Sequence, residues 1–110
     1  MMSNEPLVEA LAFIKRCVRQ RRLFWTYHVN MRLQGRSISR QMIQDAVDSL
    51  EIIEAYPDDK YLPSYLVLAC AQGVMFHILF AIDTQGDNVR VVTAYRPDPG
   101  QWSADLKRRQ

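Results

Sequence analysis

Three residues that could bind an anion or transfer a proton recur at intervals of four near the start of the chain. They are His28, Arg32 and Arg36. Residues four apart lie along one side of an α-helix, which turns every 3.6 residues. Histidine transfers protons near neutral pH, and arginine donates paired hydrogen bonds to phosphate. The spacing therefore predicts an anion site with an acid or base attached, or else a solvated basic stripe.

The second histidine, His77, lies in an apolar stretch with the period of a strand. A short loop that sets Ile82 opposite Val89 would make His77 face Ala94, with Arg96 diagonally beside it. We expect this His–Arg pair on the less buried side of the sheet. The alternative is that His77 is a hydrogen-bonded packing residue.

The hydrophobic pattern predicts helices first and strands afterwards, which is typical of the α+β class. Helices are expected at residues 6–21, 27–35 and 40–50, and strands at 51–56, 65–71, 74–83 and 89–96. Pro6 and Ser39 are suited to the starts of the first and third helices, and residues 23–25 form a short extended stretch. Short loops join antiparallel neighbours, so we expect the helices to pack on one face of a four-stranded antiparallel meander with 51–56 at its edge.

Length and composition indicate one globular domain without a membrane span. The chain has 110 residues, 48% of them hydrophobic, and no secretory signal opens it, so a cytoplasmic location is expected. Cys17 and Cys70 both sit in apolar stretches, which predicts two free, buried thiols. Their spacing to the histidines matches no metal-binding pattern, so we expect no metal and no cofactor.

The formal net charge of +2 hides a segregation of charge along the chain. Residues 1–40 carry a net +6, residues 41–105 a net −7, and the last five residues a net +3. A concentrated positive potential favours a polyanion such as RNA or DNA, or an acidic protein partner.

Several segments, in order, resemble an uncharacterised bacterial family, a domain of unknown function near the RelE and BrnT toxins. The segments are His28-x3-Arg32-x3-Arg36, residues 51–59, residues 64–68, His77 and residues 92–98. The resemblance covers residues 26–102. It leaves a helical extension at 1–25 and a basic tail at 103–110 outside this core.

The resemblance implies a RelE/BrnT-like α+β domain that works as a toxin. Relatives in the wider group cleave messenger RNA without a metal, often on the ribosome, and members of this family are commonly encoded beside a small antitoxin-like protein. Such cleavage needs a base for the ribose 2′-OH, a cation at the phosphoryl group and an acid for the leaving oxygen. The candidates for catalysis are His28, His77 and Tyr95. The candidates for phosphate binding are Arg32, Arg36 and Arg96.

A module without catalysis is the alternative function. It would use the same basic face to bind RNA, DNA or an acidic protein segment, and the lack of a lysine-rich active face favours it. The arginines at 32 and 36 could instead pair with Asp45, Asp48 or Glu51. Tyrosines at 56, 65 and 95 and tryptophans at 25 and 102 are expected to pack, and Asp58 and Asp59 to form a turn.

Overall fold

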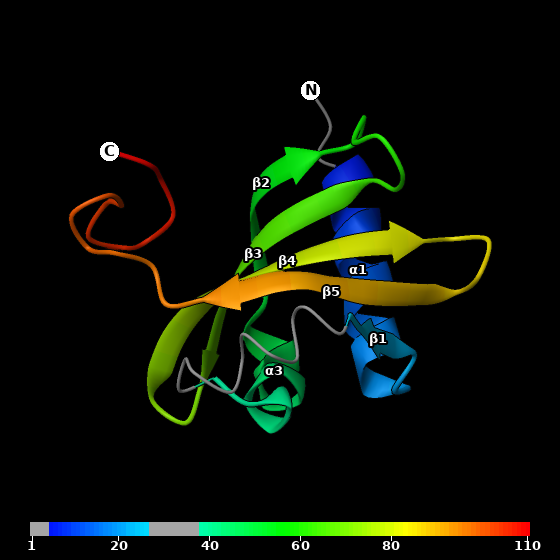
Figure 1. Cartoon of the computed structure of the whole chain (residues 1–110), viewed down its shortest axis with the longest axis horizontal. Coiled ribbons are helices and arrows are strands. Elements are labelled where there is room, and N and C mark those ends of the chain that lie inside the picture. The colour runs from blue at the N-terminus through cyan, green and yellow to red at the C-terminus, as the bar shows by residue number, and fades with distance from the viewer. Residues whose placement is uncertain (1–4, 27–37) are drawn as a thin grey trace.

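The computed structural model describes residues 5–26 and 38–110. The predicted α+β class is confirmed (Figure 1). The elements are α1 (Glu5–Arg19), β1 (Leu23–Trp25), α3 (Arg40–Asp45), the 3-10 turn η1 (Ala46–Ser49), β2 (Glu51–Tyr56), β3 (Ser64–Ala71), β4 (Val74–Asp83) and β5 (Asn88–Tyr95). The helix expected at residues 27–35 lies outside the described residues. No helix within the described ranges is long and apolar enough to cross a membrane.

One face of the sheet packs on the helices and forms the core. Phe76, Ile78 and Phe80 alternate along β4 with no exposed surface, and they join Ile14 and Ile43 from α1 and α3 in one cluster. Burying a side chain of this size contributes about 1.5–3 kcal/mol. This cluster leaves the opposite face of the sheet, here called the outer face, without a helix from the described residues.

The sheet has five strands rather than the predicted four. Its order is β1-β5-β4-β3-β2, and strands β2 to β5 run antiparallel in sequence order, with β2 at one edge as expected. The additional strand is β1, which pairs in parallel with β5 through Leu23, Phe24 and Trp25. The prediction treated these three residues only as an extended stretch, because three residues are too few to show a period.

The predicted pairing of β4 with β5 is correct at one end and wrong at the other. Ile82 lies opposite Val89, as expected, but the register shifts where Leu79 pairs with Thr93, which leaves Val92 as an extra residue in β5. Such a bulge moves every later partner by one position. The residue opposite His77 is therefore Tyr95, and the expected facing of His77 and Ala94 is wrong.

The helix ends follow local sequence signals. Ser39 caps α3, its hydroxyl accepting a hydrogen bond from the Met42 amide at 3.1 Å. α1 ends where Arg21 adopts a positive φ of 58° and the Arg22 amide bonds back to the carbonyl of Cys17. The third predicted helix, residues 40–50, is instead a short α-helix that continues into η1.

Both cysteines are free, but only one of them is buried. Cys17 has no exposed surface in the core, whereas Cys70 is exposed on β3. Cys70 lies opposite Met75, next to the two-residue turn Gln72-Gly73, as the predicted register requires. This position is at the open end of the outer face, which is why the expectation of a buried Cys70 is wrong.

Candidate functional site

The predicted His–Arg stripe lies outside the described residues. His28, Arg32 and Arg36 all fall within 27–37, so the structure does not place them. It does fix both flanks of that segment. Thr26 follows β1, and Ile38, 2% exposed, is part of the hydrophobic core.

His77 and Tyr95 do come together on the outer face. They are cross-strand partners on β4 and β5, and the Tyr95 hydroxyl lies 3.2 Å from His77 Nδ1. Their rings meet edge to face, with 5.3 Å between the centroids. Arg96 is exposed at the residue after β5 ends. Tyr95 therefore takes the place opposite His77 that the bulge-free register assigned to Ala94.

A hairpin at the end of the chain covers His77. Residues 101–110, here called the C-terminal hairpin, are closed by pairing of Trp102 with Arg109. The Trp102 ring, itself buried, lies 4.5 Å from the His77 ring, and the Leu106 carbonyl lies 2.8 Å from His77 Nε2. His77 thus lies on the expected face of the sheet, but it is 0% exposed, so the expectation of a less buried position is wrong.

The two hydrogen bonds of His77 define its tautomer. A carbonyl oxygen can only accept, so Nε2 must carry the proton that goes to Leu106, and Nδ1 then accepts from the Tyr95 hydroxyl. Burial lowers the pKa of His77, more than the Leu106 carbonyl and the nearby Glu54 carboxylate raise it. Burial also raises the pKa of Tyr95. In this arrangement both groups are neutral, and both nitrogens of the imidazole are occupied.

Ion pairs hold the C-terminal hairpin against the edge strand β2. Arg109 donates two hydrogen bonds to Glu54, at 2.8 and 3.1 Å, and its guanidinium lies 4.7 Å from the centre of the Trp102 ring. Lys107 pairs with Glu51 at 3.1 Å. The Arg109 guanidinium, helped by the Tyr56 hydroxyl, lowers the pKa of the Glu54 carboxyl. Sequence reasoning treated these cations as a basic tail because their partners lie far away in the chain.

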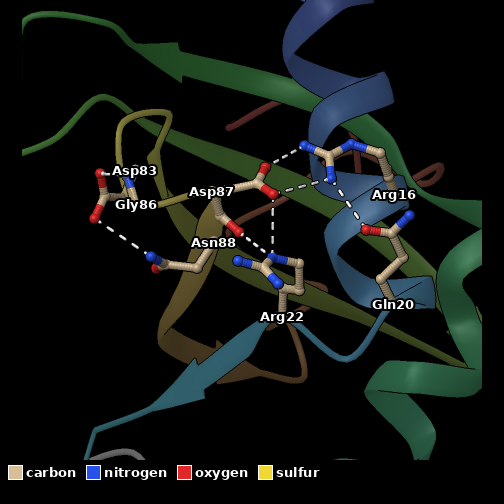
Figure 2. Close-up of polar contacts among 7 residues, drawn as sticks. All are labelled: Arg16, Gln20, Arg22, Asp83, Gly86, Asp87 and Asn88. Atoms are coloured by element: carbon tan, nitrogen blue, oxygen red, sulfur yellow. Dashed lines mark hydrogen bonds and ion pairs between the residues drawn. The ribbon is translucent and has the colours of Figure 1, made fainter.

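The arginines of α1 are also paired with carboxylates. Figure 2 shows Asp87, in the β4–β5 turn, between Arg16 of α1 and Arg22 before β1. Arg16 lies 2.5 Å from the Asp87 carboxylate, and Arg22 contacts both that carboxylate at 3.2 Å and the Asp87 carbonyl at 2.6 Å. Arg16 lowers the pKa of Asp87. Arg19 pairs with Asp48 at 2.6 Å.

These ion pairs reduce the positive charge that the basic first third of the chain offers to a ligand. Three arginines of the basic first third link α1, η1 and the β4–β5 turn through two carboxylates, so most of their charge is balanced within the fold. Asp48 and Glu51 were considered as partners for Arg32 and Arg36, but in the structure they pair with Arg19 and Lys107. Net charge along the sequence therefore overstates the positive potential that the folded surface offers.

An open pocket occupies the part of the outer face that the hairpin leaves bare. Its volume is about 590 Å³, and its floor includes Leu79 and Ala81 of β4 and Val92 of β5. Lys60 and Arg90 lie on its rim, and Thr26 closes the side from which the undescribed segment starts. This pocket was not predictable from the sequence, because small residues in buried strands have no distinct pattern.

The surroundings of the pocket and of His77 carry no assembled metal site. Among residues 5–26 and 38–110, no group of three His, Cys, Asp or Glu side chains lies close enough to hold an ion. Asp59 accepts a hydrogen bond from Ser64 and belongs to the turn before β3, as the sequence analysis expected for this pair of aspartates.

Comparison with known families identifies the region that contains the candidate residues. Residues 25–96 match the family described as Domain of unknown function (DUF4258). The chain belongs to the DUF4258 family. No curated protein and no solved structure matched the chain. The resemblance to an uncharacterised family is thus confirmed, and the relation to RelE and BrnT stays a prediction.

The limits of the DUF4258 match separate the candidate residues from the N-terminal helix and the C-terminal hairpin. All six candidate residues, from His28 to Arg96, lie within it. All of α1 and the whole C-terminal hairpin lie outside it. The cover over His77 is therefore an addition to the matched domain, whereas the floor of the open pocket belongs to the domain itself.

Proposed function

We propose that this DUF4258 chain is a toxin-type endoribonuclease of a bacterial toxin–antitoxin pair and that it cleaves RNA without a metal ion. The observation that carries the proposal is the position of Thr26. This residue lies on the rim of the open pocket with the cations Lys60 and Arg90. His28 is only two residues further along the chain, so the predicted His–Arg stripe starts beside an open, cation-flanked surface.

The proposed reaction is transfer of the phosphoryl group to the neighbouring ribose oxygen. A base removes the proton of the 2′-OH, the O2′–P bond forms, and the P–O5′ bond breaks. The departing O5′ takes a proton, which yields a 2′,3′-cyclic phosphate and a free 5′-hydroxyl. His28 is assigned to proton transfer, and Arg32 and Arg36 are assigned to the charge on the phosphoryl oxygens. Arg96, exposed after β5, is assigned to a flanking phosphate.

His77 and Tyr95 could take part in catalysis only if the C-terminal hairpin moved away from them. Both nitrogens of His77 are hydrogen-bonded, and Trp102 and Leu106 of the C-terminal hairpin cover the ring. Direct proton transfer by His77 would require the hairpin to leave. In the conformation described, His77 and Tyr95 act by holding β4, β5 and the hairpin together.

The finer fold relationship is part of the same proposal. In the RelE/BrnT-like arrangement implied by the resemblance, helices pack on one face of an antiparallel sheet, and we propose that RNA meets the other face. The open outer face beside Thr26 supports that arrangement. The resemblance to these toxins also implies the ribosome as the site of action and a small antitoxin as partner, and we include both in the proposal.

The test is incubation of purified protein with single-stranded RNA in excess EDTA. We expect cleavage to products with 2′,3′-cyclic phosphate ends, lost in His28→Ala and retained in His77→Gln. Thermal unfolding of each variant checks that loss of cleavage is not loss of fold. Absence of cleavage by the wild type, on free RNA and on translating ribosomes alike, would contradict the proposal.

A non-catalytic RNA-binding module is the second candidate, and one observation favours it. The buried, doubly bonded His77 removes one of the two histidines that a proton-transfer pair would need. In the same experiment this candidate predicts binding that weakens steeply with salt, and no cleavage.

A further inference from the structure

One row of side chains crosses all five strands on the outer face. Successive cross-strand partners link Phe24 of β1, Arg90 of β5, Ala81 of β4, Ser64 of β3 and Tyr56 of β2. Partners directly opposite each other point to the same side of a sheet. The row has aromatic rings at both ends, a cation near one end and its two smallest side chains in the middle.

The small residues explain why the face is hollow at this point. Ser64 and Ala81 have small side chains with little exposed surface, and both contribute to the lining of the pocket of about 590 Å³. That volume lies within the range of about 300–1,000 Å³ typical of small-molecule sites. Leu79 and Val92 extend the apolar floor on either side. The fold thus leaves a cavity wide enough for a planar group over its central strands.

The wall of the pocket presents an aromatic ring that the fold itself does not use for packing. Tyr61, in the loop between β2 and β3, lines the pocket and is 84% exposed. The Lys60 ammonium lies 5.3 Å from the centre of its ring. At the other side Phe24 is 56% exposed next to Arg90. Large aromatic surfaces left in water beside a cavity are a feature of binding sites.

Charge on the rim favours an anionic ligand. Lys60 and Arg90 contribute two positive charges. Arg90 meets its only close carboxylate within the described residues, Asp83, at a long 3.4 Å, and half of its side chain is exposed. Asp59 also lines the pocket, and its carboxylate accepts a hydrogen bond from the Ser64 hydroxyl. The formal charges of Lys60, Arg90 and Asp59 leave the lining with a net charge of +1. A planar apolar floor with an exposed ring and two cations matches a nucleobase attached to a phosphate.

We propose that this pocket binds one nucleotide of a single-stranded RNA, with its base against Tyr61 and Val92 and its phosphate between Lys60 and Arg90. Aromatic rings on an open sheet commonly stack the bases of single strands, whereas duplex bases are stacked on one another and cannot enter. The inference rests on the proposed function in its substrate, RNA. It adds a subsite that selects unpaired nucleotides beside the segment starting at Thr26.

The probe is a fluorescein-labelled single-stranded 12-mer with 2′-O-methyl riboses, which cannot be cleaved through the 2′-oxygen. We expect Tyr61→Ala to weaken binding by about fivefold or more, the lower end of the range for loss of one stacked base. Tyr61→Phe, which keeps the ring, should bind within about twofold of the wild type. Arg90→Ala should weaken binding and lower the salt dependence by about one phosphate contact.

The matched controls are Met75→Ala and Arg108→Ala. Both positions are exposed, and neither lines the pocket. These controls should bind like the wild type, and a 12-base-pair duplex of the same sequence should bind more weakly than the single strand. Equal affinity of wild type and Tyr61→Ala, or no binding of the single strand at all, would overturn the inference.

The outcomes separate this inference from the proposed function. Binding that depends on Tyr61 and Arg90 without cleavage of unmodified RNA would leave the pocket standing and refute the ribonuclease. Cleavage that needs His28 but is indifferent to Tyr61 and Arg90 would refute the pocket alone. If Tyr61→Ala leaves RNA affinity unchanged but abolishes binding of a co-expressed antitoxin, the pocket is a protein-docking site and the inference is wrong.

Discussion

Lowering the pH should destabilise this fold through one buried side chain, His77. The ring is 0% exposed, and burial lowers its pKa below the ordinary value of about 6.5. The groups that face it are the Glu54–Arg109 ion pair, whose charges offset each other, and the neutral hydroxyl of Tyr95. None of these supplies a net negative charge to stabilise an imidazolium.

The direction of the effect follows from the lowered pKa. Between the folded pKa and about pH 6.5 the unfolded chain binds more protons than the folded chain, so the free energy of unfolding falls as the pH falls. The stabilisation is fully present above about pH 6.5. Through this window a single group contributes a slope of at most about 1.4 kcal/mol per pH unit. Carboxyls with lowered pKa, such as Glu54 and Asp87, lose their contribution only at lower pH.

His77→Gln is the variant that isolates this slope. An amide can still donate to the Leu106 carbonyl and accept from the Tyr95 hydroxyl, but it loses the ring contacts at 4.5 and 5.3 Å. At about 0.5–1.5 kcal/mol for each of the two ring pairs, we expect it to be less stable than the wild type by about 1–3 kcal/mol at pH 7.5. The two curves should then converge as the wild type loses stability in acid.

The assay is urea unfolding between pH 5 and pH 7.5, followed by tryptophan fluorescence. His28→Gln in the same series isolates any contribution of the second histidine. Parallel pH dependence of wild type and His77→Gln would refute the reasoning, because it would mean that His77 does not change its proton affinity on folding.

Three further predictions concern contacts outside this cluster. Ser39→Ala removes the hydroxyl that accepts from the Met42 amide and should lower the free energy of unfolding by about 1 kcal/mol, measured by urea titration; no change would exclude a capping role. Cys70 should react with a thiol reagent in the native protein, whereas Cys17 should react only in denaturant, and mass spectrometry of the labelled protein would show the reverse order if the burial is wrong. Asp87→Asn should lower the free energy of unfolding only slightly, because its ion pairs are partly exposed, and 1 M salt should reduce the difference between variant and wild type, measured by the same urea titration.

The long antiparallel strands were predictable because each has a local period-two pattern and short turn sequences at its ends. Residues 51–56 and 74–83 were predicted with the bounds that the structure shows. The Gln72-Gly73 turn, with both residues at positive φ, sets Cys70 opposite Met75 and thereby the register of β3 on β4. Local turn chemistry and period-two patterning were sufficient for this part of the fold.

Features that depend on distant partners were not predictable. β1 is a strand only because β5 offers it a parallel edge, and its three residues contain no period. The bulge at Val92 leaves no mark in the sequence, yet it alone decides that Tyr95 rather than Ala94 faces His77. A register derived from a turn is therefore reliable near the turn and loses its value beyond the first irregularity.

The candidate site shows the same limit for charge. Arg109 looked like part of a solvated tail, but Glu54, 55 residues away, fixes it over Trp102 and so closes the cover on His77. Arg16 looked like part of a nucleic-acid-binding surface, but Asp87 engages it. A count of charges along the chain cannot distinguish a cation whose ion pair links two elements of the fold from an exposed cation that is available to bind a ligand.

That distinction narrows the surface on which an RNA phosphate could be bound. Figure 1 shows the C-terminal segment curling beyond the end of β5, where its cations pair with the edge strand β2. At the opposite end of the sheet, Arg16 of α1 and Arg22, before β1, hold the β4–β5 turn. Among the described cations, those on the rim of the pocket combine exposure with an adjoining apolar floor. Thr26, the last described residue before the segment that carries His28, lies on this same rim, so variants of the rim test the proposed subsite on the matched domain itself.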